Sequence, residues 1–158
     1  MKGITIAEEC HVINALPPVD MTGGKTSLYW TMRNYYSHAD IIISLGAAVN
    51  ADTITVFESA DNAGTGEHAI VFKYYSEVTA AGDVLDRVAT DATTAGFASA
   101  SAGTANTMHV ISVDASQLQE DHPFMCVKLT SAGAQLGAVI VILSGARFAE
   151  ESSVTALA

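Results

Sequence analysis

Basic side chains are scarce in this sequence: 7 Lys and Arg stand against 17 Asp and Glu, which gives a formal net charge of −10 over 158 residues. So few cations cannot supply the phosphate contacts of a nucleic-acid-binding domain. Charged residues of both signs make up only 15% of the chain, whereas hydrophobic residues make up 49%. This composition excludes a disordered acidic chain, and the length predicts one domain with its own core.

Cysteine is nearly absent, with only Cys10 and Cys126. Residues 1–10 contain two glutamates and no apolar run of seven, so we expect no secretory signal, synthesis in a reducing cytoplasm, and two free thiols. The longest uncharged apolar stretch is residues 129–146, but glycines and polar residues interrupt it and its dense part is rich in β-branched side chains. We interpret that part as a buried strand, and we expect no membrane span.

The local motifs of catalysis and cofactor binding are also missing: the chain has no G-x-S-x-G, GxxxxGK[ST], GxGxxG, HExxH or CxxC. The histidines are scattered, so a metal site would have to assemble from separate strands. His38 with Asp40 and His68 with Glu67 each place an imidazole near a carboxylate, so a Ser/His/Asp set stays open, because such sets are recognised by geometry. The acidic loop 58–67 lacks EF-hand spacing and favours a solvated hairpin loop. We predict no enzyme activity, no cofactor and no metal.

Short strands separated by turn residues dominate what is present. Segments of strand length and composition are residues 27–35, 39–45, 53–57, 68–75, 96–102, 107–113, 124–130 and 138–143. Residues 53–57 and 68–75 are expected to pair as an antiparallel unit. Residues 114–118 begin with Asp and predict a single helical turn. The pattern predicts an all-β fold, an antiparallel β-sandwich or jelly-roll-like barrel of about eight or nine short strands.

The chain is expected to have three parts: an N-terminal strand or arm (1–24), the sandwich (25–149) and a C-terminal tail (150–158). Pro17 and Pro18 cannot donate ladder hydrogen bonds, so residues 16–24 predict a turn or an arm. The apolar run 138–143 predicts a central strand covered on both faces, by the fold or by another subunit. The tail lacks any pattern, and we expect it to be exposed or docked on a partner.

Clustered aromatic residues supply candidate interface positions, because Tyr and Trp are enriched at interface hot spots. The candidate interface residues are Tyr29, Trp30, Tyr35, Tyr36, Tyr74, Tyr75, Arg147 and Phe148. Together with the apolar strand they predict a homo-oligomer, with a trimer favoured over another closed ring. Stacking on nucleic-acid bases is disfavoured because cationic flanks are missing. A carbohydrate- or receptor-binding sandwich that stacks sugars on Trp30 and the tyrosines stays open.

The order of these segments is itself a recognisable feature. After an aromatic strand come ADIIISLGA at residues 39–47, TITVFESADNAGT at 53–65 and AIVFKYY at 69–75; VISVDASQL follows at 110–118, and the segments 124–129 and 139–148 complete the series. Over residues 25–150 this series resembles a group of small proteins encoded among the virion structural genes of tailed bacteriophages and prophages.

The resemblance implies a non-enzymatic virion component, a capsid decoration (cement) protein that binds the outside of the major capsid shell. Its expected partners are the major capsid protein and further copies of the chain, and its expected location is the capsid surface. A head–tail, tail or spike component is the alternative within the virion.

Overall fold

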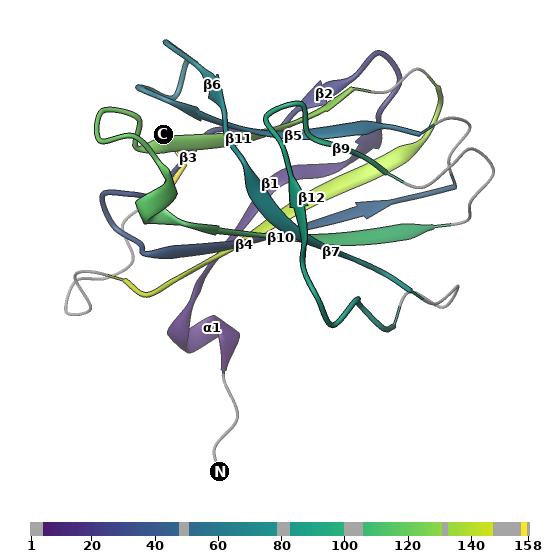
Figure 1. The fold of residues 1–158 in the computed structure, drawn as a ribbon, viewed down its shortest axis with the longest axis horizontal. Helices are drawn as coiled ribbons and strands as arrows, with labels where there is room; N and C mark the ends of the chain where they lie inside the picture. Colours follow the sequence, from purple (N-terminus) through teal and green to yellow (C-terminus); the bar gives the residue numbers. More distant parts are fainter. Residues whose placement is uncertain are drawn as a thin grey trace.

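Two antiparallel sheets pack face to face in the computed structural model, which describes residues 5–47, 51–78, 83–99, 106–130, 133–146 and 156–157 (Figure 1). The first sheet contains, in spatial order, β1 (His11–Asp20), β12 (Leu136–Ser144), β4 (His38–Leu45), β10 (Thr107–Asp114), β7 (Phe72–Ser76) and β8 (Thr90–Ala92). The second is built on β11 (Phe124–Thr130) and β5 (Thr53–Ser59), with β2 (Lys25–Thr26) and β3 (Trp30–Thr31) beside β11 and with β6 (His68–Ala69) and β9 (Phe97–Ala98) beside β5.

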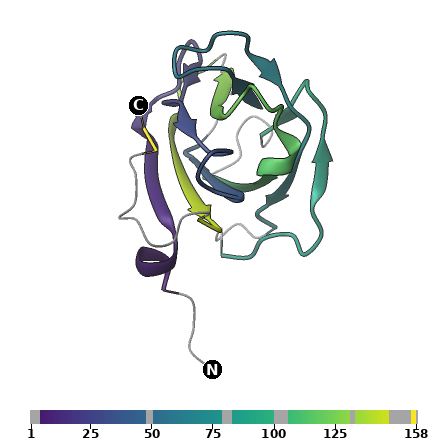
Figure 2. The ribbon, with the colours of Figure 1, turned by 90° about the vertical axis from the view of Figure 1, so that its left-hand side faces the viewer.

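The strand pairs join the two halves of the chain into one long antiparallel ribbon. β1 pairs with β12, β2 and β3 pair with β11, β4 pairs with β10, and β5 pairs with β6. Successive segments of this ribbon lie alternately in the first and the second sheet, which is a jelly-roll arrangement. Figure 2 shows the strands curving around a common interior. The predicted all-β sandwich is therefore confirmed.

Alternation along the strands builds the core. In β4, β10 and β12 every second side chain is buried, so each strand has one inner and one outer face. Side chains from both sheets meet between them, and those with no more than 1% exposed surface include Ile41, Ile43, Ile54, Val56, Ile111, Met125, Val127, Leu129, Val139 and Val141. Burying each such side chain contributes about 1.5–3 kcal/mol, which makes this interior the main source of stability.

Most of the predicted strands are confirmed, but the first one is wrong. Segments 39–45, 53–57, 107–113, 124–130 and 138–143 form β4, β5, β10, β11 and β12, and the predicted helical turn is the 3-10 helix Ala115–Gln117. Residues 27–35 contain only β3, because the chain turns at Met32. The Met32 carbonyl accepts hydrogen bonds from the backbone N–H groups of Tyr35 (3.1 Å) and Tyr36 (2.8 Å).

The segment 68–75 belongs to both sheets. β6 pairs with β5, as predicted, but β7 pairs with β10 in the first sheet. The chain crosses between the sheets at Ile70 and Phe72, whose side chains are both buried in the core. Of the weak strand predicted at 96–102, only β9 is formed, and residues 100–102 lie outside the described residues.

Pro17 and Pro18 lie inside β1, so the turn or arm predicted from residue 16 is wrong in its first half. β1 is an edge strand that pairs only with β12, and its register shifts between Leu16 and Val19. An edge strand tolerates residues without an N–H donor, because one side of it has no ladder partner. Residues 11–20 are thus part of the sandwich, while the helix α1 (Ile6–Glu9) projects from it with no buried residue (Figure 1).

Within the described residues, no helix is long and apolar enough to cross a membrane. The two cysteines are free thiols, with Cys126 buried and Cys10 partly buried.

Candidate functional site

An apolar strip crosses the outer face of the first sheet. It consists of Val12, Ile142, Ile140, Ile42, Val110 and Tyr75. In register, Val12 lies opposite Ile142, and Ile42 lies between Ile140 and Val110. Val12 is 49% exposed and Ile140 is 41% exposed, and the others are partly exposed. The inner face of β12 is buried as predicted, whereas the described residues leave its outer face open to solvent; cover by another subunit stays a prediction.

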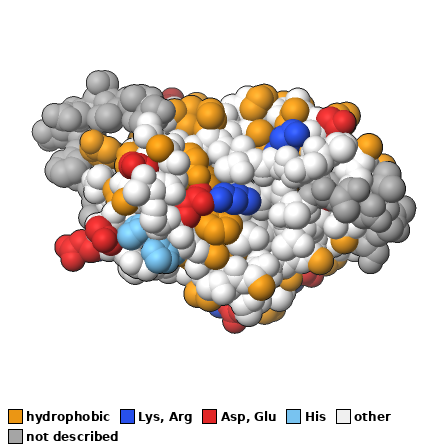
Figure 3. Space-filling model, turned by 90° about the horizontal axis from the view of Figure 1, so that it is seen from above, with side chains coloured by type: hydrophobic (Ala, Val, Ile, Leu, Met, Phe, Trp, Pro, Cys, Tyr) orange, Lys and Arg blue, Asp and Glu red, His pale blue; other side chains and the backbone are white. Residues whose placement is uncertain are grey.

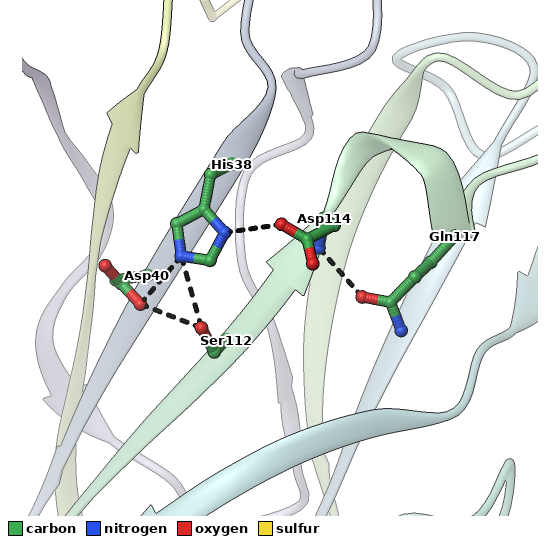
Figure 4. Close-up of polar contacts among 5 residues, drawn as sticks. All are labelled: His38, Asp40, Ser112, Asp114 and Gln117. Carbon is green, nitrogen blue, oxygen red and sulfur yellow. Dashed lines mark hydrogen bonds and ion pairs between the residues drawn. The ribbon is translucent and has the colours of Figure 1, made fainter.

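A polar cluster on the central strands β4 and β10 borders this strip along one side. Figure 4 shows its residues. His38 and Asp40 come from β4, and Ser112 and Asp114 come from β10. The His38 Nδ1 atom lies 2.8 Å from Asp114 Oδ1, and its Nε2 atom lies 3.2 Å from both Asp40 Oδ1 and Ser112 Oγ. The Gln117 side chain accepts a hydrogen bond from the backbone N–H of Asp114 (2.8 Å) and fixes the end of β10. Because Asp40 lies opposite Ile142, the cluster directly adjoins the apolar strip.

The charges in this cluster favour a protonated imidazole. Partial burial lowers the pKa of His38, but the hydrogen bonds with Asp114 and Asp40 outweigh it and raise that pKa above 6.5. Both ring nitrogens of His38 then donate, one to each carboxylate. The Ser112 hydroxyl donates to Asp40 Oδ1 (3.2 Å) as well. The cluster therefore clamps the start of β4 to the end of β10.

The same residues have the composition of a Ser/His/Asp catalytic set but not its working geometry. In such a set, neutral histidine accepts the serine proton at Nε2. Here Asp40 faces that nitrogen and favours a proton on it, so His38 is a poor acceptor for the Ser112 proton. Ser112 also lies in a strand paired on both sides, to Asp40 and to Lys73, so its neighbouring amides belong to the sheet rather than to an oxyanion hole.

The outer face of the second sheet carries a separate charged cluster. Glu67 accepts hydrogen bonds from the Tyr29 hydroxyl and from Lys128 Nζ, and Lys128 lies over the Phe57 ring at 4.4 Å. Figure 3 shows this face, with acidic and basic side chains in contact beside apolar ones. Partial burial alone would raise the pKa of Glu67, but the bonds from Lys128 and Tyr29 hold it below its usual value. Burial raises the pKa of the Cys126 thiol to about 12. These contacts hold the loop before β6 against the sheet.

Predicted interface residues are divided between core and surface. Trp30 is fully buried and Tyr36 is 5% exposed within the single chain, so these two rings belong to its core rather than to an exposed surface, and their part in an interface stays a prediction. Tyr35 and Tyr74 pack against the core, and Tyr29 binds Glu67. Only Tyr75 reaches the apolar strip, so it stays a prediction for an interface. Arg147 and Phe148 lie outside the described residues.

The remaining histidines and acidic groups do not converge on an ion. His122 contacts Asp121 (2.8 Å) and the Gly66 carbonyl (2.9 Å). The Asp61 carboxylate accepts hydrogen bonds from the Thr65 N–H (2.9 Å) and hydroxyl (2.6 Å), so both of its oxygens are hydrogen-bonded within the same loop. In the part of the chain that the structure describes, no three His, Cys, Asp or Glu residues lie in a group that could hold a metal.

Sequence reasoning flagged His38 and Asp40 but missed Ser112 and Asp114. The four residues become neighbours only through the register of β4 and β10, in which Asp114 lies opposite His38 and Ser112 opposite Asp40. A paired-strand prediction with the correct register would have found them.

No protein family, curated protein or solved structure matches this chain.

Proposed function

We propose that the protein is a non-enzymatic structural protein of a bacteriophage virion, a decoration protein that binds the outside of the major capsid shell. The observation that carries the proposal is the apolar strip on the outer face of the first sheet. The resemblance of the segment order to small virion structural proteins supplies the kind of partner. The jelly-roll arrangement agrees with it, since viral capsid and lectin domains use this fold.

The strip suits contact with a protein surface because little charge has to be desolvated to bury it. The charged groups at its border are paired with each other. Asp40 lies 3.2 Å from the His38 ring, and Lys73 lies 2.7 Å from Asp91. On a chain with a net charge of −10, a neutral apolar band is the surface that a partner can cover at the lowest electrostatic cost.

Two alternative functions lose support from the placement of their key residues. A sugar-binding sandwich would stack its ligand on exposed aromatic rings, but Trp30 has no exposed surface. A hydrolase would need His38 to accept a proton from Ser112, and Asp40 opposes that. A head–tail, tail or spike component would use the same strip at a different position in the particle, and the copy number per virion separates it from a shell protein present in hundreds of copies.

The test is co-sedimentation of the purified protein with shells of the phage that encodes it, prepared without the protein. We expect the wild type to bind and Ile140→Asp to lose binding, since a carboxylate in the strip would have to be desolvated. Val88→Asp is the matched control, because Val88 is 79% exposed and lies outside the strip. Absence of the protein from virions, or failure of the wild type to bind shells, would refute the proposal. Light scattering of the free protein tests the predicted trimer separately.

A further inference from the structure

The outer edge of β3 is occupied by a distant part of the same chain. Leu157 forms an antiparallel bridge with Trp30, and the backbone N–H of Thr31 donates to the Ala156 carbonyl at 2.8 Å. Ala156 is 1% exposed, and Leu157 packs against the core. In Figure 1 this short segment lies beside β3, next to the end of the chain. The expectation that the tail is exposed or docked on a partner is therefore wrong for residues 156–157, which dock on their own chain in the structure.

This edge has the properties of a strand-acceptor site. β3 pairs with β11 on its other side, so the Thr31 N–H points away from the sheet and needs an outside acceptor. Trp30, beside it, is fully buried. An extended segment therefore binds through its main chain, with a small residue at the buried position of Ala156 and a leucine packed against the core. That is recognition by β-strand addition.

We propose that the edge of β3 is a general acceptor for such a segment and that, in an assembly, it takes residues 156–157 of a second copy of the chain. Among the described residues, the segment in contact with β3 consists of residues 156–157. In sequence, residues 147–155 separate it from Ala146, the last described residue after β12. A segment from a second copy forms the same contacts as the chain's own, so exchange replaces each contact with an identical one, as in domain swapping. This inference does not rest on the proposed function, because the capsid shell plays no part in it.

Two complementary chains test the exchange. The acceptor chain contains residues 1–149, which leaves its β3 edge empty. The donor chain is full length and carries Thr31→Pro, which removes the N–H that binds Ala156 and so blocks its own edge. We expect neither chain to exchange its segment when it is alone, and we expect an equimolar mixture to give a complex of donor and acceptor by size-exclusion chromatography with light scattering.

A synthetic peptide of residues 150–158 tests the acceptor site without the donor fold. Trp30 is the only tryptophan, so the emission of the acceptor chain reports on this edge directly. Binding of the peptide should be saturable and should shift the Trp30 emission to shorter wavelength. Adding Leu157→Asp to the peptide or the donor should weaken binding by about tenfold or more, the effect of losing roughly one net favourable contact. Val88→Asp in the donor is the control and should leave the heterodimer intact.

Each outcome decides one part of the proposal. No emission change with the peptide at millimolar concentration would overturn the acceptor site. Peptide binding without any heterodimer, together with a full-length protein that stays monomeric, would overturn exchange between copies. Because neither readout uses capsids, failure here leaves the shell-binding test unaffected.

Discussion

His109 makes the stability of the fold depend on pH, and the size of the effect follows from its surroundings. Its side chain points into the sandwich from β10 and is 5% exposed. Nδ1 lies 3.0 Å from Ser76 Oγ, Nε2 has no hydrogen-bond partner, and the ring meets Phe97 edge-on at 5.1 Å. No carboxylate among the described residues is hydrogen-bonded to the ring, so burial favours the neutral form and lowers the pKa of His109 from 6.5 to about 4.

The unfolded chain therefore takes up a proton at a higher pH than the folded chain. The folded state therefore has its full stability with respect to His109 above pH 6.5, where the ring is neutral in both the folded and the unfolded chain. Its free energy of unfolding falls as the pH drops from 6.5 towards 4, because only the unfolded chain is protonated in this range. The difference between the two pKa values, at about 1.36 kcal/mol for each unit, corresponds to about 3 kcal/mol in total. About 2.5 kcal/mol of this should be lost by pH 4.5. A domain with a typical stability of about 5–15 kcal/mol would register such a loss clearly.

The assay is urea unfolding followed by Trp30 emission at pH 7.5, 6.5, 5.5 and 4.5. His109→Gln removes the titrating group, so its free energy of unfolding should lose about 2.5 kcal/mol less than that of the wild type over this range. His68→Gln makes the same change at an exposed position and should keep the wild-type loss. Equal losses in His109→Gln and the wild type would refute the reasoning, whatever the absolute stabilities.

Two further predictions concern a clamp and a turn. His38→Gln should lower the free energy of unfolding more at pH 5.5 than at pH 9, because the pKa of His38 is raised in the folded state. The stabilisation from protonated His38 is complete below pH 6.5 and is lost as the pH rises through that raised pKa. An equal loss at both pH values in urea unfolding would contradict the clamp. Gly96→Ala should lower the free energy of unfolding by about 2–4 kcal/mol, since Gly96 has φ +77° and a Cβ there would overlap the Ile54 carbonyl oxygen. The matched change Gly23→Ala, also at φ +77° but with nothing within 4 Å, should cost only about 1–2 kcal/mol in the same measurement.

The prolines and aromatic residues are features whose place in the fold could not be predicted from the sequence. Pro17 and Pro18 argued against a strand, yet they lie in β1, because the ladder requires donors only on the paired side of an edge strand. Whether a strand lies at an edge depends on the order of strands in the sheet, which no local pattern contains. Trp30 and Tyr36 suggested an exposed interface by residue type, but both rings are buried within the chain, where Trp30 pairs with Leu157.

The sequence by itself determined the class of fold and, where polar and apolar residues alternate, the buried face of a strand. Thr and apolar residues alternate over residues 53–57, and Ile54 and Val56 are buried as that pattern requires. Residues 41–43 of β4 and 138–143 of β12 are apolar at every position, so the sequence did not show which of their faces is buried. Only the tertiary structure decided which strands pair, and therefore which residues meet. His38 reaches Asp114 and Ser112 across a sheet, and Trp30 reaches Leu157 across nearly the whole chain. The physical reason is that alternation is a local property, whereas register and strand order are chosen by which long-range pairing buries the inner faces together.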